Sequence, residues 1–270
     1  MNSCSSDSNA ESSTQLLERF RSEFRFKLAK SDEEKRRIYR LRYEIYCDEL
    51  GYEEPADAHE RLEYDEYDER SVHCLIEHRR SGITAGCMRL VLPSSDNDCR
   101  DTRLPLQSYA GQSLTHDVFH PALLDKKEIC EVSRLAISLP FRRRSVKGGG
   151  ESSATSHFLE FTRDEKQTFP VIVVGLFLAT YALVGMTHRR HVFAMMEPKL
   201  PRLLAMSGFH FTQVGDNIDF HGKRSAFYID QHKAEKEIHA KLLPLYRHIQ
   251  DELESQETHF TEQKSLSTTS

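Results

Sequence analysis

Residues 130–138, CEVSRLAIS, alternate apolar and polar side chains in the manner of a β-strand, yet the stretch carries two charges. Successive side chains of a strand face opposite sides, so regular alternation places Glu131 on one face and Arg134 on the other. On an edge strand, a lone pair of this kind usually consists of two ordinary surface residues. The significance of these two charges therefore depends on what the rest of the chain places beside them.

The flanking sequence predicts strands and helices in mixed order. FRFKLAK alternates as a half-buried strand, and Ser31 with Glu34 forms a capping box for an amphipathic helix that ends near Gly51. The segments VHCLIEH and TAGCMRLVL flank RRSG, which is typical of a β-hairpin. Further on come the strand HVFAMME, the short helix KLPRLLAMSG, two strands around GDNIDFHGKR, and a last helix interrupted at Pro244. The order predicts an α/β fold in which helices cover a sheet.

The 270 residues suit one domain with excursions. Residues 1–22 and 257–270 are rich in Ser, Thr and charged groups, which predicts disordered tails. We therefore expect the folded domain over residues 23–232, with a mobile insertion at about 148–168, and a C-terminal helix over residues 233–256.

Residues 169–187, FPVIVVGLFLATYALVGMT, contain no charged side chain, and two arginines follow. Their length is close to that of a membrane span. Pro170, Gly175 and Gly185, together with soluble-type strands on both sides, favour a helix buried against the sheet. Association with a membrane stays open as an alternative to this soluble arrangement.

Composition narrows the function classes. A formal charge of −5 argues against a general nucleic-acid binder. The six cysteines form no CxxC pair, and the N-terminus lacks a secretory signal pattern, so the cytoplasm is the expected compartment. The fourteen histidines lack convincing ligand spacing, so we expect no metal site.

Several charged and aromatic residues recur in a pattern that resembles the signature of the acyl-homoserine-lactone autoinducer synthases and the long-chain N-acyl amino acid synthases. RYEIYCDELGY, EYDEYD, GCMRLV and EVSRLAI carry the resemblance. The matching positions are Arg42, Tyr46, Tyr52, Asp65, Asp68, Arg89, Glu131 and Arg134. The chain is also similar to acyltransferases associated with PEP-CTERM/exosortase systems, from about residue 24 to residue 229.

The resemblance implies the GNAT N-acyltransferase fold: a central, twisted, mostly antiparallel sheet with a splayed strand and helices on both faces. It implies transfer of a fatty acyl chain from a carrier thioester to the amine of an amino acid-like acceptor. Autoinducer synthases more usually carry Phe and Trp where this chain has Tyr46 and Tyr52. A homoserine-lactone synthase using S-adenosylmethionine and a non-catalytic acyl-carrier-binding or regulatory module remain alternatives.

The same resemblance suggests roles for the residues. Glu131 is the expected general base or amine anchor, with a pKa raised by burial, and Arg134 is expected to hold Asp65 or Asp68 through a paired fork. Arg89 joins these two as a catalytic candidate. Acceptor binding is expected from Arg42, Tyr46, Tyr52, Asp65 and Asp68.

The basic run RRRSVKGGG follows the strand where GNAT enzymes place their pyrophosphate-binding loop, but its spacing differs from the standard one. That departure favours a phosphopantetheine arm on acidic acyl-carrier protein over coenzyme A as the donor, with no permanently bound cofactor. The residues expected to meet the carrier are Arg142, Arg143, Arg144 and Lys147.

Overall fold

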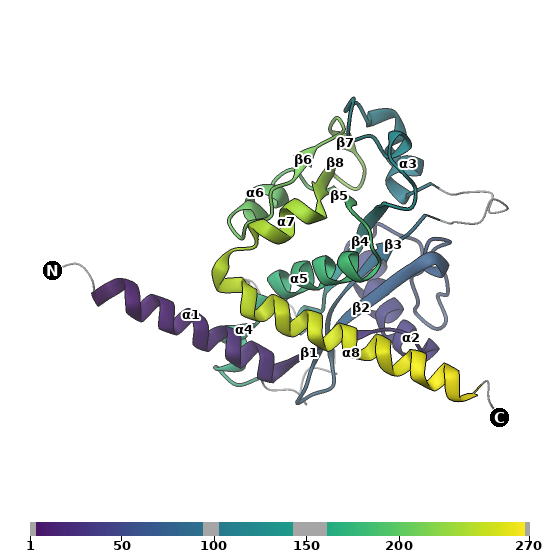
Figure 1. Cartoon of the computed structure of the whole chain (residues 1–270). Coiled ribbons are helices and arrows are strands. Elements are labelled where there is room, and N and C mark those ends of the chain that lie inside the picture. The colour runs from purple at the N-terminus through teal and green to yellow at the C-terminus, as the bar shows by residue number, and fades with distance from the viewer. Residues whose placement is uncertain (1–3, 94–102, 143–160, 268–270) are drawn as a thin grey trace, which may run out of the picture.

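A computed structural model of the chain describes residues 4–93, 103–142 and 161–267. Within them, one eight-stranded sheet has the order β1-β2-β3-β4-β5-β8-β6, with β7 paired to β8 (Figure 1). All neighbours are antiparallel except β4 and β5. The strands are β1 (Phe24–Leu28), β2 (Ser71–His78), β3 (Thr84–Val91), β4 (Ile129–Ile137), β5 (His191–Met196), β6 (Thr212–Gln213), β7 (Ile218–Asp219) and β8 (Lys223–Asp230). The predicted mixed α/β fold with a mostly antiparallel sheet is confirmed.

The parallel pair β4 and β5 is joined over only part of its length. Pairing runs from Ile129 opposite His191 to Val132 opposite Ala194, whereas β4 continues to Ile137. Beyond Val132 the edge of β4 that faces β5 therefore has no partner in the ladder. We call this open stretch between the two strands the splay.

A β-bulge in β4 overturns the expectation that Glu131 and Arg134 face opposite sides. Ala136 pairs with Cys87 and Ser133 pairs with Arg89, so β4 carries one extra residue between these pairs. Arg134 has a left-handed backbone with φ 53. A bulge of this kind interrupts the alternation, so the Arg134 side chain turns to the face that also carries Glu131 and Ser133. Regular alternation was the wrong assumption.

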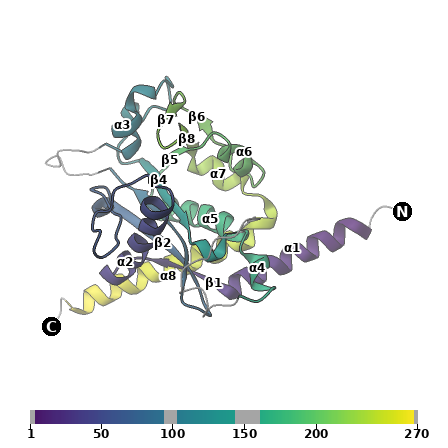
Figure 2. The ribbon, with the colours of Figure 1, turned by 180° about the vertical axis from the view of Figure 1, so that it is seen from behind.

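Helices cover both faces of the sheet (Figure 1 and Figure 2). On one face, α5 (Val171–Met186) and α8 (Leu243–Ser267) pack over β1 to β5, with the end of α1 (Cys4–Glu23) beside them. On the other face, α2 (Asp32–Arg42) and the π-helix that continues it (Tyr43–Glu49) cover β2 to β4. The remaining α-helices are α3 (Pro105–Ala110), α4 (Glu165–Thr168), α6 (Leu200–Ala205) and α7 (Gln231–Glu237).

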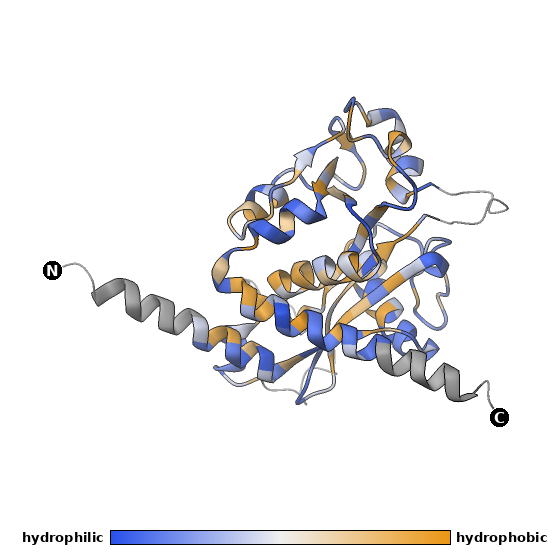
Figure 3. Ribbon diagram, viewed as in Figure 1, coloured by the Kyte–Doolittle hydropathy of each residue, from blue (hydrophilic) through white to orange (hydrophobic). Residues whose placement is uncertain are grey.

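The apolar segment forms the core helix α5, as the sequence predicts. Ile172, Leu176 and Val184 are fully buried, and Figure 3 shows the helix apolar along its length, between the sheet and α8. Gly175 brings α5 close to β1, since a Cβ there would lie 3.0 Å from the Phe26 ring. No helix in the described part of the chain is long and apolar enough to cross a membrane.

The ends of the chain differ from the predicted disordered tails over residues 1–22 and 257–270. Helix α1 spans Cys4–Glu23, and its Phe20 is fully buried and stacks on Phe24 at 4.8 Å between ring centroids. The Ser-rich composition of the segment gave no sign that Phe20 is buried against the sheet. At the other end α8 continues to Ser267, because extending an existing helix is far easier than starting one.

The C-terminal helix expected over residues 233–256 is two helices, α7 and α8. A 3-10 turn at Ala240–Leu242 separates them, and Pro244 lies in the first turn of α8, where proline is tolerated. Most of the insertion expected at about 148–168 lies outside the described residues. Its end contains α4, whose Glu165 is buried.

Candidate active site

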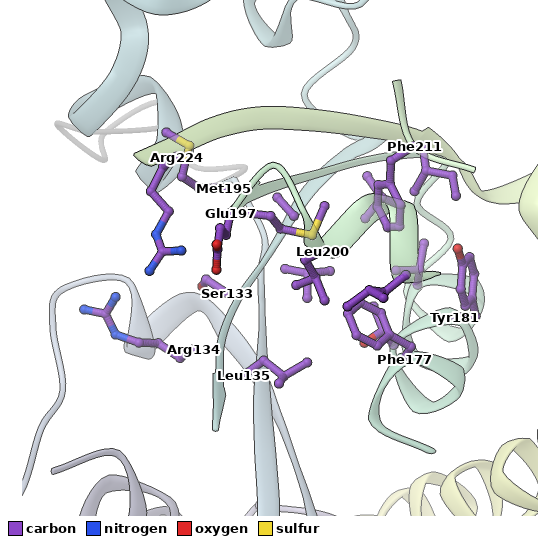
Figure 4. A pocket seen from close by; sticks show the side chains of 18 of the residues that line it. Ser133, Arg134, Leu135, Phe177, Tyr181, Met195, Glu197, Leu200, Phe211 and Arg224 are labelled. Atoms are coloured by element: carbon purple, nitrogen blue, oxygen red, sulfur yellow. The ribbon is translucent and has the colours of Figure 1, made fainter. Parts of the chain in front are cut away.

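Two adjoining cavities lie where β4 and β5 separate. The larger one, about 440 Å³, is enclosed by β4, β5, α5 and α6 and is mainly apolar, with Leu135, Phe177, Leu200 and Phe211 among its walls (Figure 4). The smaller one, about 160 Å³, is more polar and contains Glu131. Both cavities are lined by Tyr46, Ser133, Arg134, Met195 and Arg224. We call them the apolar cavity and the polar cavity.

Glu131 is a buried titratable group of the polar cavity. Glu131 is 2 % exposed, and one of its carboxylate oxygens accepts a hydrogen bond of 2.8 Å from the Leu106 backbone N–H. Burial raises the pKa of Glu131 to about 8, although that hydrogen bond and the charges of Arg89 and Arg134 oppose the rise. A carboxyl group with this pKa can accept a proton near neutral pH and release it again.

Behind the cavities lies a group of buried charges that we call the sealed network. Arg42 is fully buried and donates to both carboxylate oxygens of Asp68, at 2.6 and 2.9 Å, and also to Glu63. Arg89 donates to Asp65 at 2.5 Å and lies 3.1 Å from Asp68. Arg89 also donates to the Ser133 hydroxyl at 3.0 Å, which ties the network to the bulge of β4.

Electrostatics keep the sealed network ionised. Burial alone would raise the pKa of Asp68, but Arg42 and Arg89 lower it below its ordinary value. The pKa of Arg42 is raised despite burial, because Asp68 and Glu63 stabilise the guanidinium. Next to them, burial lowers the pKa of His73 to about 4. Opposite charges thus compensate one another inside the protein, at the edge of the site.

Arg134 connects the sealed network to the cavities. Its Nη2 lies 2.9 Å from Glu53, 3.1 Å from Glu63 and 3.3 Å from Asp65. Its guanidinium also lies over the Tyr46 ring, 5.4 Å from the centroid. Arg134 therefore contacts Asp65, one of its two expected partners. The paired fork on Asp68 comes from Arg42 instead.

The two tyrosines of the sequence pattern both line the polar cavity. The Tyr46 hydroxyl donates to the Leu135 carbonyl at 2.9 Å, which fixes the ring beside the splay. Tyr52 stacks on His221, with ring centroids 4.7 Å apart. Aromatic side chains from distant parts of the sequence therefore wall the polar cavity.

The sequence-predicted residues fall into two groups. Glu131, Arg134, Tyr46 and Tyr52 line one or both cavities. The other four, which line neither cavity, belong to the sealed network: Arg42, Asp65, Asp68 and Arg89.

The basic residues expected at the donor side can be placed only in part. Arg142 follows β4 and pairs with Glu49, with one hydrogen bond of 3.0 Å. The other three residues, Arg143, Arg144 and Lys147, lie outside the described residues.

Two functional candidates escaped the sequence reasoning. Glu63 opens the segment EYDEYDE and bridges Arg42 and Arg134, but four further carboxylates in that segment masked it. Arg224 lines both cavities from the start of β8. Arg224 ends the motif DFHGKR, but the local sequence did not show that this strand lies beside the cavities. Over residues 4–93, 103–142 and 161–267, no cluster of His, Cys, Asp or Glu could hold a metal ion.

Residues 41–148 match the family model described as an acetyltransferase (GNAT) domain. No curated protein sequence matches the chain. Among solved structures, the chain is similar to the AHL synthase LasI (TM-score 0.53, 15 % identity, 80 % of this chain and 94 % of that one). FeeM, an N-acyl amino acid synthase from uncultured soil microbes, gives TM-score 0.51 and 14 % identity with the same coverage. The CoA-dependent acyl-homoserine lactone synthase BjaI gives a TM-score of 0.55 and 18 % identity, with 83 % of this chain and 87 % of that one covered.

The family match identifies a GNAT acetyltransferase domain over residues 41–148, and the sheet of the chain has the GNAT-like fold. Within that fold, the chain shares its architecture with acyl-homoserine lactone synthases and an N-acyl amino acid synthase.

Proposed function

We propose that the protein transfers a fatty acyl chain from a thioester to the amine of an amino acid-like acceptor. The observation that carries this proposal is the pair of cavities that meet at the splay. An acyl chain requires an apolar space, and the cavity of about 440 Å³ provides one. The amine requires a proton acceptor at the end of that space, and Glu131 provides it in the polar cavity.

The reaction needs few groups. The neutral amine attacks the thioester carbonyl, the new N–C bond forms, the C–S bond breaks, and the thiolate leaves. Glu131 accepts the proton that the amine loses, and the departing thiolate takes up a proton. Backbone groups of β4 at the splay are suited to stabilising the oxyanion, because they lie where the ladder with β5 has ended. The sealed network holds the bulge in place through Arg89 and Ser133.

The proposed donor is an acyl chain on the phosphopantetheine arm of acyl-carrier protein, with acyl-CoA as the alternative. The basic residues after β4 favour an acidic carrier. BjaI, whose structure is described with isopentyl-CoA, supports the alternative. The reducing cytoplasm is the proposed compartment, and the buried free thiols of Cys74, Cys87 and Cys130 fit it.

A second candidate is synthesis of an acyl-homoserine lactone from S-adenosylmethionine. The likeness to LasI and BjaI favours it, and BjaI is described in complex with SAM. Against it, Tyr46 and Tyr52 replace the Phe and Trp usual in those enzymes, so the aromatic walls of the polar cavity differ. A module that binds carriers without catalysis would keep the apolar cavity but would have no need for a carboxyl group with a pKa of about 8.

The test is a product assay with purified protein. Dodecanoyl-CoA and dodecanoyl-carrier protein are each incubated with the common amino acids or with S-adenosylmethionine, and products are identified by mass spectrometry. N-acyl amino acids that disappear with the Glu131→Gln variant are expected. Release of methylthioadenosine would favour the lactone synthase, and donor binding without any product would favour the non-catalytic module.

A further inference from the structure

Arg224 is a cation at the junction of the two cavities, and it forms no ion pair with a described carboxylate. It is the second residue of β8, is half-buried, and lines both the apolar and the polar cavity. In the part of the chain that the structure describes, no hydrogen bond or ion pair engages its guanidinium. Figure 4 shows Arg224 and Arg134 entering the same space from opposite sides.

Among the described residues, the other charges around the two cavities do not supply a partner for Arg224. Glu197 lines the apolar cavity with Arg224, but its ion pair is with Lys199, at 3.9 Å. Glu53 pairs with Arg134, which also contacts Glu63 and Asp65. Glu131 has a pKa of about 8, so it is mostly neutral at pH 7. An arginine side chain stays protonated even when it is partly buried. The junction therefore carries an uncompensated positive charge that suits a bound anion.

The turn before Arg224 shapes the cavity around this charge. His221 and Gly222 both have positive φ, 51 and 87, and the turn is closed by a hydrogen bond from the Phe220 N–H to the Gly222 carbonyl. The turn brings Phe220 against Tyr109, at 5.4 Å between ring centroids. A small cavity with aromatic walls, the buried carboxyl group of Glu131 and one unpaired guanidinium complements a small molecule that bears both an amine and an anion.

We infer that Arg224 binds the carboxylate of the acceptor and so selects amino acids over simple amines. This inference rests on the proposed function and adds the recognition of the acceptor. The carboxylate accepts hydrogen bonds from the Arg224 guanidinium, whose planar fork matches two carboxylate oxygens. With the carboxylate at Arg224, the amine is directed toward Glu131, since both residues line the polar cavity.

Binding of product analogues tests the inference without depending on turnover. N-dodecanoylglycine and N-dodecanoylglycinamide have the same size, but only the first carries a carboxylate. By calorimetry at pH 7, the wild-type protein should bind the acid at least about tenfold more tightly, since a charged hydrogen-bonded pair typically contributes that much. Arg224→Gln should remove the preference, and Arg224→Lys should keep part of it.

Lys223→Gln is the matched control, because it removes the same charge from the neighbouring, exposed position. It should leave the preference for the acid unchanged. Equal wild-type affinity for acid and amide, or an unchanged preference in Arg224→Gln, would overturn the inference.

Kinetics separate this inference from two other outcomes. If acyl transfer occurs and Arg224→Gln raises KM only for dodecanoyl-CoA and not for dodecanoyl-pantetheine, Arg224 binds a donor phosphate and the inference fails. If the protein prefers the acid in the binding assay but makes no product from any amine, the proposed transfer fails while the carboxylate site stands.

Discussion

The sealed network and the polar cavity are neighbouring charged regions that differ in how their charges are paired. In the sealed network each charge meets its opposite at hydrogen-bond distance, as Arg42 does with Asp68 and Glu63. In the polar cavity, Glu131 accepts one backbone hydrogen bond and has its pKa raised to about 8, and Arg224 has no partner among the described residues. Compensated charges hold a shape, whereas uncompensated charges at a cavity are available to a substrate.

Arg134 belongs to both regions, which explains how they are coupled. It lines the two cavities and contacts Glu63 and Asp65 of the sealed network. Because its backbone forms the bulge, the same residue sets the geometry of β4 at the splay. The network can therefore position the site without touching a substrate.

The largest expected effect is on stability, from breaking the sealed network. Arg42→Met leaves Asp68 and Glu63 buried without their main partner, and removing one member of such a buried pair costs about 3–5 kcal/mol. The free energy of unfolding, measured in urea, should fall by that amount. Arg40→Met on the same helix is the control: Arg40 is 55 % exposed and 3.7 Å from Glu60, so the change should stay within about 0.5 kcal/mol. A small effect of Arg42→Met would show that the network is dispensable.

Glu131→Gln should instead affect turnover while the fold remains. Loss of a general base typically lowers the rate about 10²–10⁴-fold. In the wild type, turnover should rise with pH through about 8, because the base acts as the carboxylate and its pKa has that value. The acceptor amine also titrates, so the profile is measured with two acceptors of different amine pKa. An inflection that follows the amine, and survives in Glu131→Gln, would exclude Glu131 as the base.

The same residue should produce a pH dependence of stability with a defined sign. The Glu131 pKa is about 8 in the folded protein and about 4.5 when unfolded, so the folded state binds the extra proton between these values. Its contribution to stability is full below pH 4.5 and is lost as pH rises toward 8. The melting temperature of Glu131→Gln, relative to wild type, should therefore increase between pH 5 and pH 8. A constant difference would show that Glu131 titrates normally.

The sequence predicted the frame of this molecule better than the details of its site. The capping box at Ser31 and Glu34, the hairpin and the core helix were visible because they depend on local patterns. The bulge at Arg134 was not, because a left-handed residue in a strand has no signature when it is not glycine. One extra residue in β4 was enough to reverse the expected direction of a key side chain.

The sequence was equally limited in placing the residues of the site. The sequence pattern named Glu131 and Arg134, but it could not separate residues that line the cavities from those behind them, such as Arg42 and Asp68. That distinction depends on the packing of α2 and the acidic segment against β3 and β4. Arg224 stands about ninety residues after Arg134, and only the pairing of β8 with β5 brings it near the splay.

A smaller effect is expected from filling the apolar cavity. Ala194 on β5 lines this cavity, and Ala194→Leu reduces the space for the acyl chain. Since each buried methylene contributes about 0.8 kcal/mol, or roughly fourfold in affinity, the variant should lose activity with tetradecanoyl donors before octanoyl donors. The short donor is the internal control in competition assays. An equal loss for both chain lengths would show that the chain binds elsewhere.

The smallest effect is expected from charges outside both regions, in the basic run after β4. We expect an acidic carrier protein to be steered by Arg142, Arg143 and Arg144, so replacing all three with Ala should raise KM for dodecanoyl-carrier protein several-fold and leave turnover at saturation unchanged. Arg142→Ala alone should do less, because Arg142 is already paired with Glu49. The wild-type KM should also rise with salt, and that dependence should weaken in the triple variant. If acyl-CoA serves equally well and salt changes neither donor, the carrier does not dock on this run, although the acyl transfer itself would stand.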